Sequence, residues 1–401
     1  MKQKKLLLLG GLRYLIPVIK AAHELGLYVI TCDYIPDNIA HKYSDEYHNV
    51  SIINKESVLN LAKKLKINGI MSFAVDPGVV TAAYVGEKLG LPTCPYESVK
   101  ILQNKALFRK FLKENSFNVP TAQSFFNENI SYKDLSKFNF PVIVKPVDSA
   151  GSKGVTKVDK IKKIKSAIKT AILNSISGEY IIEDFIEQKG FASDTDCFSI
   201  NNEIKFYSFS NQYFDKKAKN PFTPAAYSWP STINKKNINL LKDELQRLVK
   251  LLNLGTSIYN VEVRESIDGK AYIMEVSPRG GGNRLSEVLK YATGIDLIKN
   301  AVKASIGYNS LDIYQQDCKN YWAEIILHAN KKGVFNKIII DKIINKNHIV
   351  ELDLWIKKGD NISIFNNAND AIGTLILQFD TIAQLEKIMS CQENWLNVVV
   401  N

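Results

Sequence analysis

Short apolar runs alternate with amphipathic segments over the first 95 residues. The apolar runs are residues 6–9, 28–32 and 70–74, and segments with helical periodicity separate them at residues 14–25, 57–65 and 79–89. Strands that alternate with helices predict a parallel sheet wrapped by helices. Such a sheet binds ligands at the carboxyl ends of its strands, which is where Gly10, Gly11, Asp33 and Asp76 fall. Taken alone, Gly10-Gly11 indicates a tight turn as readily as a ligand site.

From about residue 96 onward, longer helices are predicted among strands. The helices are expected at residues 98–115, with Ser98 as N-cap, and at 160–173, 237–252 and 286–306. The strands are expected at residues 141–146, 180–184 and between 196 and 214. Beyond residue 320, short strands are broken by glycines and followed by a helix near residues 381–389. The pattern predicts an α/β fold class (α+β overall), with a parallel-sheet domain first and a small β-rich segment last.

The dipeptide Asp268-Gly269 separates two strand-like runs and provides the strongest local prediction. Asp-Gly between such runs is a signal for a two-residue hairpin turn. A two-residue turn fixes the register of the two strands, so that Ile267 faces Lys270. The register then predicts which side chains meet further along the hairpin.

Counting outward places Glu262 directly opposite Glu275, and Asn260 opposite Ser277. Residues opposite one another have Cβ atoms about 4.5–5.5 Å apart, where like charges are destabilising. The two carboxylates therefore need a proton or a cation between them, and Mg²⁺ prefers carboxylate oxygens that it shares with substrate phosphates. The alternatives are an exposed sheet face, where both side chains point into water, or a bulge that shifts the register.

Basic and glycine-rich segments lie on both sides of the hairpin. Arg279 opens the Gly-Gly-Gly-Asn-Arg loop at 280–284, where glycines let backbone amides approach an anion and arginine offers a fork for phosphate or carboxylate oxygens. Lys145 ends an apolar run and precedes the loop 148–155, which resembles a phosphate cradle but lacks the P-loop pattern. Lys105 is a second candidate phosphate contact. Each feature alone fits a surface residue or flexible loop equally well, and they gain weight only as a set.

Composition narrows the class of protein. With 401 residues, 45% hydrophobic and 23% charged, the chain has the make-up of a soluble globular protein of two or three domains. The formal charge of +11 is spread along the chain, so we expect attraction of an anionic substrate rather than nucleic-acid binding. Five scattered cysteines fit neither a disulfide framework nor a zinc site. The apolar run at 6–9 is too short for a signal peptide, and no segment approaches the roughly 18 residues of a membrane span, so we expect a cytoplasmic protein without a membrane partner.

In their order along the chain, these residues resemble the ATP-grasp superfamily. The family order is matched by Lys105, Lys145 with its Gly/Ser loop, residues 183–186, Glu262, Glu275 and Arg279. The resemblance covers about residues 103–287, and it is the ordered combination rather than any single motif that is specific. The closest likeness is to L-amino-acid ligases and to biotin-carboxylase-like and carbamoyl-phosphate-synthase-like proteins. It implies a Rossmann-like domain at 1–95, an ATP-grasp domain at 96–310 with a lid at about 120–182, and a C-terminal β-rich subdomain at 311–401.

The resemblance implies ATP and Mg²⁺, or Mn²⁺ in its place, as cofactors. The phosphates would be held by Lys105, Lys145, Gly151 and Ser152. The adenine would be framed at the end of the 180–184 strand by Glu183, Asp184, Phe185 and Ile186. Glu262, Glu275 and Ser277 would bind the metal, and Arg279 would stabilise the transferring phosphoryl group.

Two positions depart from the family pattern. Ser277 stands where most relatives carry asparagine, so that one metal ligand is weaker or is replaced with help from Asn260. Gly190 stands where an acidic residue would hold the ribose, and the nearby substitutes are Ser193, Asp194 and Asp196. The ribose contact is therefore not assigned.

The activity that the resemblance implies is ATP-dependent ligation of a carboxylate to an amine through an acyl phosphate, with release of ADP and phosphate. The partners would be a small-molecule carboxylate and amine, and a homodimer is implied by resemblance alone. One alternative phosphorylates bicarbonate or a carbamate; it ranks lower because the sequence holds no glutaminase-like segment and no biotin-carrier Met-Lys-Met. The other alternative is a nucleotide-binding protein without turnover. The substrates depend on the first domain and on residues 211–229, and the sequence does not identify them.

Overall fold

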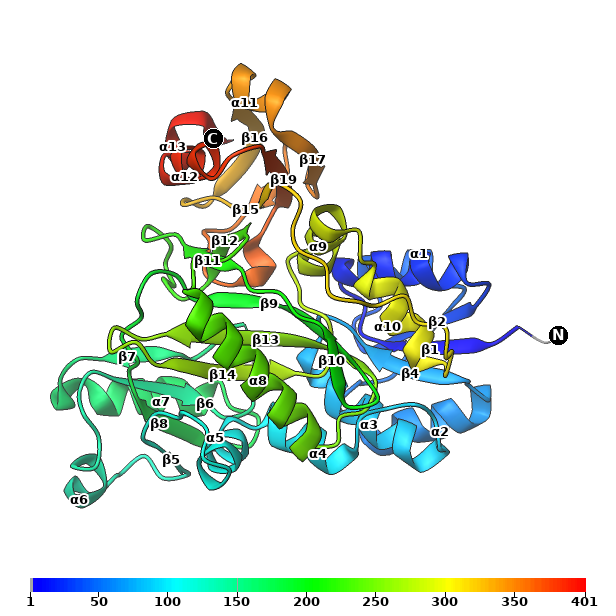
Figure 1. Cartoon of the computed structure of the whole chain (residues 1–401), viewed down its shortest axis with the longest axis horizontal. Coiled ribbons are helices and arrows are strands. Elements are labelled where there is room, and N and C mark those ends of the chain that lie inside the picture. The colour runs from blue at the N-terminus through cyan, green and yellow to red at the C-terminus, as the bar shows by residue number, and fades with distance from the viewer. Residues whose placement is uncertain (1–2, 150) are drawn as a thin grey trace.

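The computed structural model describes residues 3–149 and 151–401. Its first domain is a parallel four-stranded sheet of order β3-β2-β1-β4, which confirms the predicted class (Figure 1). The strands are β1 (Lys5–Leu9), β2 (Tyr28–Asp33), β3 (Glu46–Asn49) and β4 (Gly69–Ser72), and the main helices are α1 (Ile16–Glu24), α2 (Lys55–Leu65) and α3 (Asp76–Leu89). Leucines 6 to 9 are fully buried, as expected of a strand covered on both faces. The sequence pattern missed β3, which carries few apolar residues.

Gly10 and Gly11 follow β1 and are required by close packing of the domain's own loops. A Cβ on Gly10 (φ +116°) would lie 2.8 Å from Cγ2 of Val75, and one on Gly11 would lie 2.4 Å from Nε2 of His41. No side chain fits at either position. The packing of this turn therefore explains why both residues are glycine.

The segment predicted as one helix at 98–115 is two helices, α4 (Tyr96–Gln103) and α5 (Lys105–Glu114). Asn104 separates them with an extended backbone (φ −111°, ψ 114°). Its side-chain oxygen accepts hydrogen bonds from the amides of Ala106 (2.9 Å) and Leu107 (3.0 Å), which makes it the N-cap of α5. The prediction of a single helix was wrong here because a capping residue lies inside the apolar period.

The segment predicted as one helix at 286–306 is also divided, into α9 (Leu285–Thr293) and α10 (Leu297–Ser305). Gly294 ends α9 with a left-handed backbone at φ +82°. This is the usual use of glycine after a helix, and the apolar periodicity hid it.

Two antiparallel sheets follow in the chain. The first, of order β5-β8-β6-β7, consists of β5 (Ala122–Phe125), β6 (Val142–Pro146), β7 (Thr156–Val158) and β8 (Tyr180–Asp184), and α7 (Ile164–Leu173) packs against its apolar face. The second, of order β10-β9-β13-β14, consists of β9 (Ser193–Ile200), β10 (Glu203–Phe206), β13 (Ser257–Glu265) and β14 (Ala271–Ser277). One face of this second sheet packs against α8 (Lys235–Leu251), which leaves the other face to carry polar side chains.

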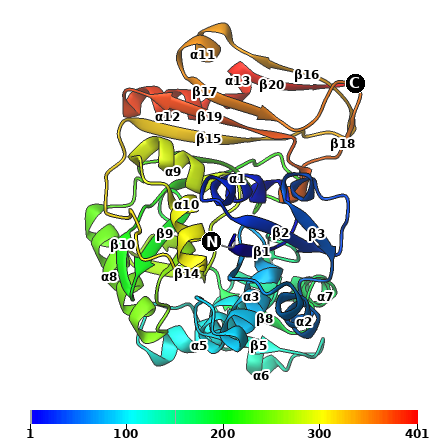
Figure 2. The same cartoon turned by 90° about the vertical axis from the view of Figure 1, so that its right-hand side faces the viewer.

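A five-stranded sheet of order β11-β12-β15-β19-β17 lies next to α9 (Figure 2). It consists of β11 (Asn211–Phe214), β12 (Pro224–Trp229), β15 (Tyr321–Leu327), β17 (Ile349–Leu354) and β19 (Gly373–Phe379). A smaller sheet of β18 (Asn361–Ile362), β16 (Gly333–Ile340) and β20 (Leu396–Val400) and the helices α11 (Lys342–Asn347), α12 (Ile382–Ser390) and α13 (Gln392–Trp395) complete the C-terminal part. The five-stranded sheet thus joins strands from before and after residue 310.

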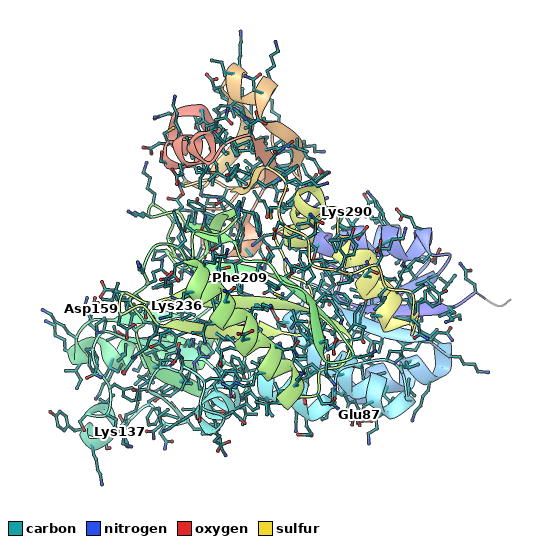
Figure 3. All side chains as sticks on the ribbon, viewed as in Figure 1. Glu87, Lys137, Asp159, Phe209, Lys236 and Lys290 are labelled. Carbon is teal, nitrogen blue, oxygen red and sulfur yellow. The ribbon has the colours of Figure 1, made fainter. Side chains whose placement is uncertain are left out.

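Charged side chains are distributed over several parts of the surface. Figure 3 labels Lys137, Asp159, Lys236 and Lys290, all exposed, on four different parts of the molecule. Within the described residues, no helix is long and apolar enough to cross a membrane.

Candidate functional site

Glu262 and Glu275 lie directly opposite one another on β13 and β14, as the sequence predicts. Asn260 likewise lies opposite Ser277. The side chains of Glu262 and Glu275 are 30% and 36% exposed, so both carboxylates remain accessible from the polar face of the sheet. Two accessible carboxylates at this spacing can share a divalent cation.

The turn itself differs from the prediction. The amide of Ser266 donates to the carbonyl of Lys270 (2.8 Å), which leaves a three-residue loop, and Gly269 adopts φ +81°. The prediction that Ile267 faces Lys270 was therefore wrong. The register shifts back by one residue because Met274 is an extra residue on β14, a β-bulge between the pairs made by residues 262 and 263. The two deviations offset each other.

The neighbouring strand β9 extends the row of carboxylates. Asp194 lies opposite Glu262, so Asp194, Glu262 and Glu275 follow one another across three strands. Asn260 donates to Oδ1 of Asp194 at 2.8 Å and to Oδ1 of Asp196 at 3.3 Å. Burial, reinforced by the charge of Glu262, raises the pKa of Asp194 to about 7. Asp194 is thus protonated or ionised according to what binds near it.

This donor set suits Mg²⁺ held jointly by protein and substrate. In the described part of the chain, no group of three or more His, Cys, Asp and Glu side chains is arranged to hold a metal by itself. Mg²⁺ commonly takes one or two carboxylates and completes its shell with water and phosphate oxygens. Glu262 and Glu275 fit that pattern.

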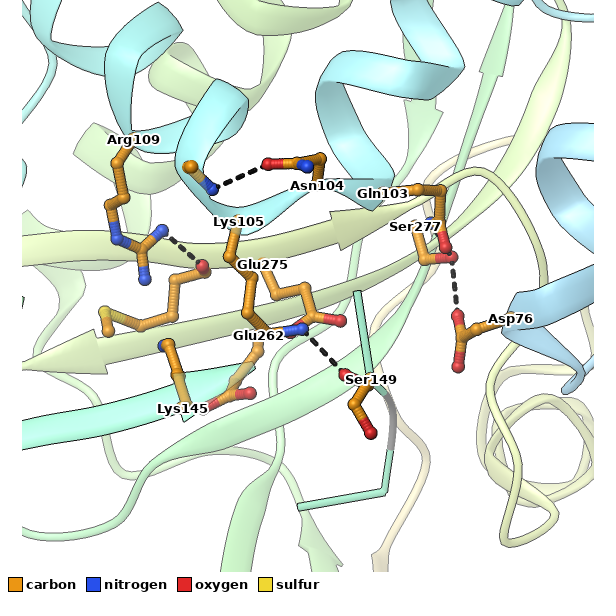
Figure 4. A network of polar contacts seen from close by, with 12 residues as sticks. Asp76, Gln103, Asn104, Lys105, Arg109, Lys145, Ser149, Glu262, Glu275 and Ser277 are labelled. Atoms are coloured by element: carbon orange, nitrogen blue, oxygen red, sulfur yellow. Dashed lines mark hydrogen bonds and ion pairs between the residues drawn. The ribbon is translucent and has the colours of Figure 1, made fainter. Parts of the chain in front are cut away.

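Ser277 is engaged in a separate hydrogen-bond chain. Its hydroxyl donates to Oδ1 of Asp76 (3.1 Å) and accepts a hydrogen bond from Nε2 of Gln103 (2.7 Å), and the residue is 1% exposed. Figure 4 shows this chain beside the glutamate pair. Its assignment as a metal ligand stays a prediction.

Lys105, the first residue of α5, reaches the glutamate pair (Figure 4). Its ammonium lies 3.6 Å from Oε2 of Glu275 and donates to the carbonyl of Ser149 at 3.0 Å. The capping by Asn104 sets where α5 starts and hence where Lys105 points. A positive charge next to the carboxylate pair is the arrangement that phosphate binding requires.

Lys145 forms an ion pair with Glu183 (2.5 Å), which is also held by Arg109 (2.9 Å). Glu183 is 2% exposed. Burial acts to raise the pKa of Glu183, but the charges of Arg109 and Lys145 outweigh it and lower the pKa to about 2. Burial, together with the positive charges of Arg109 and Lys105, lowers the pKa of Lys145. The side chain of Glu183 therefore orients Lys145, and its predicted adenine contact would have to come from its backbone.

Arg109 was not identified from the sequence. It lies one helical turn after Lys105 on α5, and its guanidinium also donates to the carbonyl of Met274, the bulge residue of β14 (2.7 Å). A basic residue four positions after a candidate lysine lies on the same face of a helix. That spacing could have identified Arg109 from the sequence.

The other predicted hinge residues follow Glu183. The side chain of Asp184 accepts from the amide of Asn139 (2.9 Å), and the amide of Phe185 donates to the carbonyl of Pro141 (3.0 Å). Ile186 is buried. The amide of Phe185 is thus already used within the protein.

The predicted phosphate loop contacts a different region. Ser152 donates to the carbonyl of Phe222 (3.0 Å), and a Cβ on Gly151 (φ +66°) would meet no atom within 4 Å. Ala150, between Lys105's partner Ser149 and this glycine, lies outside the described residues. The structure therefore joins only the start of the loop to the glutamate pair.

Arg279 is held by a carboxylate from the first domain. Its guanidinium donates to both oxygens of Asp76, at 2.8 and 2.9 Å, and the residue is 8% exposed. A Cβ on Gly280 would lie 2.2 Å from the ring of Phe73, and the amide of Gly281 donates to Asp196 at 2.8 Å. Gly280 thus permits the loop to pack closely on Phe73, and the amide of Gly281 meets a carboxylate of the protein itself. That the loop binds a phosphate stays a prediction.

Comparisons with known proteins agree with this fold. Residues 138–287 match the family model of the ATP-grasp domain. The carbamoyl phosphate synthase large chain of Pseudothermotoga lettingae is 26% identical over 292 residues, 72% of this chain and 26% of that one. That of Thermoanaerobacter sp. (strain X514) is 23% identical over 261 residues, 64% of this chain and 23% of that one. This chain thus spans about a quarter of the length of these relatives.

Solved structures resemble the chain over its whole length. They include an L-amino acid ligase from Bacillus licheniformis (TM-score 0.81, 20% identity, all of both chains) and a phosphoribosylglycinamide synthetase from Anaerococcus prevotii (0.77, 23%, all of both chains). A third is the biotin carboxylase domain of Hydrogenobacter thermophilus 2-oxoglutarate carboxylase with MgADP and bicarbonate (0.74, 15%, 100% of this chain and 91% of that one). At these identities the likeness establishes the fold. The ATP-grasp family match covers residues 138–287, the segment that contains Glu262 and Glu275.

Proposed function

We propose that this chain is an ATP-dependent ligase that joins a small-molecule carboxylate to an amine. The observation that carries the proposal is the Glu262–Glu275 pair with the ammonium of Lys105 3.6 Å from Glu275. Two opposed carboxylates beside a lysine are suited to binding the magnesium complex of a nucleoside triphosphate. Without a ligand, the two like charges would only repel each other. Glu262 and Glu275 would hold Mg²⁺, which, when bound, would neutralise phosphate charge.

The proposed reaction has two steps. A carboxylate oxygen of the first substrate attacks the γ-phosphorus of ATP, the bond to the β-phosphate oxygen breaks, and ADP leaves. The amine nitrogen then attacks the acyl carbon, the bond to the phosphate oxygen breaks, and phosphate leaves as the amine loses a proton. Such transfers are accelerated chiefly by positioning and charge neutralisation. In this proposal Lys105 and Lys145 contact the phosphates, and Arg279 faces the transferring phosphoryl group.

The remaining assignments belong to the same proposal. The adenine would lie at residues 183–186, and Gly151 and Ser152 would cap the phosphates from the lid. All five cysteines are free, which supports a reducing, cytoplasmic setting for the reaction. A homodimer is included as a proposal that a sedimentation measurement would test.

A second candidate reaction is phosphorylation of bicarbonate or a carbamate. The similarity to carbamoyl phosphate synthase large chains favours it. The assay that separates the candidates supplies ATP and Mg²⁺ with pools of carboxylic acids and amino acids and follows ADP and phosphate. Release that requires both an acid and an amine supports the ligase, whereas release with bicarbonate alone supports the second candidate. ATP binding without turnover in any pool would favour a nucleotide-binding protein.

The first prediction concerns the glutamate pair. Glu275→Gln removes one of the two opposed charges, so we expect loss of Mg²⁺-dependent ADP release by at least about 10²-fold with the fold retained. Glu203→Gln is the matched control, since Glu203 is an exposed glutamate at the edge of the same sheet, and it should behave as the unaltered chain. Full activity in Glu275→Gln would remove this pair from the mechanism.

A further inference from the structure

Glu324, on β15, is a fully buried carboxylate that the proposed phosphoryl-transfer site does not use. The residue is 0% exposed, and neither carboxylate oxygen has a hydrogen-bond partner among the described residues. Nor does any described Lys, Arg or His lie within ion-pairing distance of it. Buried carboxylates are normally hydrogen-bonded or paired, because burying an unpaired charge is costly. An unpartnered one at this depth is neutral by itself and becomes charged only when a cation is supplied from outside the chain.

Polar groups from three parts of the chain converge near Glu324. Tyr227 lies directly opposite it on β12. The hydroxyl of Tyr227 donates to Oδ2 of Asp194 (3.1 Å) and accepts from Nδ2 of Asn283 (3.3 Å), whose Oδ1 accepts from the hydroxyl of Tyr14 (3.1 Å). The first domain, the loop after Arg279 and the five-stranded sheet thus each contribute a polar side chain to one region.

The local charge is negative. The guanidinium of Arg284 is already bound by Glu287 (2.9 Å) and Glu351 (2.8 Å). Burial raises the pKa of Glu324 well above its ordinary value, Arg284 opposes that rise, and Glu287 and Asp194 add to it. The nearby arginine therefore does not keep Glu324 ionised, whereas a cation bound against its oxygens would favour the ionised form.

We infer that Glu324 recognises the ammonium group of the amine substrate, with Tyr227 and Asn283 beside it. This inference rests on the proposed ligase function and names the class of its second substrate, a primary amine that carries a positive charge. An ammonium offers three N–H donors, and two carboxylate oxygens plus a hydroxyl or amide oxygen can accept them. A divalent metal is a poorer occupant, because such a cation prefers several oxygen ligands of which one or two are carboxylates still open to water and phosphate, whereas Glu324 is fully buried.

The position suits the chemistry. Tyr227 links Glu324, its strand neighbour, to Asp194, and Asp194 lies opposite Glu262 in the candidate metal row. An ammonium held at Glu324 would therefore lie on the side of the site where the acyl phosphate is proposed to form. It would give one proton to the carboxylate of Glu324, which frees the nitrogen lone pair for attack on the acyl carbon, and it would lose the second proton as phosphate leaves. Asn283 follows Arg279 by four residues in the same loop. This loop therefore connects the proposed phosphoryl-transfer site to the region around Glu324.

The test measures ammonium binding without turnover. The full chain is unfolded by heat in methylammonium chloride and in tetramethylammonium chloride, at equal concentrations up to about 0.1 M, where charge screening is the same. Methylammonium presents N–H donors and tetramethylammonium presents none. We expect methylammonium alone to raise the unfolding temperature, since a ligand that binds only the folded state stabilises it.

Glu324→Gln should abolish this difference and raise the apparent dissociation constant of methylammonium on the order of 30-fold or more. Replacing an unpaired buried acid by its amide should leave the fold intact, and Glu386→Gln, an exposed change on α12, is the control. Equal effects of the two salts on the unaltered chain would overturn the inference, as would an unchanged response of Glu324→Gln. The salt comparison stands even if that variant does not fold. Failure to find any acid–amine pair that releases ADP would count against the ligase, while the unfolding data would still decide the ammonium site.

Discussion

At the scale of single residues, Glu183 and its two cations form the most strongly coupled group in the molecule. Lys145 and Arg109 each donate to a different oxygen of this buried carboxylate. Removing one member of such a group leaves the others buried without compensation. The orientation of Lys145, and with it one proposed phosphate contact, therefore depends on a glutamate that does not itself reach the opposed pair on β13 and β14.

We predict that Glu183→Gln destabilises the fold by about 3–5 kcal/mol at neutral pH and weakens ATP binding. The pKa of Glu183 is about 2 in the folded protein, below its ordinary value of 4.5. The stabilisation is therefore fully present above the ordinary value and is lost as the pH falls towards the folded value. Urea unfolding of both proteins at decreasing pH should show their difference shrinking. Glu244→Gln, which breaks a more exposed pair with Arg247, should cost less than about 1 kcal/mol, and an equal cost for both would argue against the coupled group.

At the scale of elements, Asn104 determines where α5 begins and therefore where Lys105 lies. We predict that Asn104→Ala costs about 1 kcal/mol of stability and also weakens ATP binding by several-fold. Asn54→Ala is the matched control, because Asn54 caps α2 through the amide of Ser57 (3.1 Å) far from the site. It should show the same loss in urea unfolding with unchanged ATP affinity. Equal ATP affinities in the two variants would mean that the cap does not position Lys105.

The hairpin shows how far local sequence rules reach. Asp268-Gly269 correctly located the turn, and alternation correctly opposed Glu262 to Glu275. The three-residue loop and the bulge at Met274 were not predicted, because both depend on contacts beyond the hairpin, including the hydrogen bond from Arg109 to the bulge carbonyl. The predicted register was right at the glutamates because the two deviations cancel. Strands with strong apolar runs, such as β1 and β8, were predictable for the same local reason.

Sequence reasoning missed the contacts and roles that depend on the assembled structure. Asp194 joins the carboxylate row through pairing of β9 with β13, and no local spacing contains that information. Glu324 stands in an apolar strand, where its isolation is visible only once the surrounding side chains are placed. Asp76 lies on α3 and Arg279 beyond β14, and their contact spans 203 positions. Long-range contacts of this kind carry no signal in a single sequence.

At the scale of the whole molecule, two ion pairs of different character join the first domain to later parts of the chain among the described residues. Asp76 binds the buried guanidinium of Arg279 through both oxygens. Glu24, on α1, meets Lys299, on α10, at 2.9 Å; Glu24 is exposed and Lys299 is half-buried. Because only the first pair includes a residue proposed to contact the transferring phosphoryl group, the two pairs separate domain attachment from catalysis.

We predict that Asp76→Asn lowers turnover by about 10²-fold, since a displaced catalytic group of this kind commonly costs that much, and lowers stability by on the order of 2 kcal/mol because Arg279 loses its counter-charge. ATP affinity should change little, because the lysines and the 183–186 segment are untouched. Glu24→Gln, the control, breaks a more exposed pair between the same two parts of the chain and should change neither turnover nor stability by more than about 1 kcal/mol. The measurements are ADP release and urea unfolding of the unaltered chain, Asp76→Asn and Glu24→Gln. A similar loss of turnover in both variants would mean that the first domain acts only as a packing surface. A loss confined to Asp76→Asn would show that turnover depends on Arg279 being held in place by a carboxylate of the N-terminal parallel-sheet region.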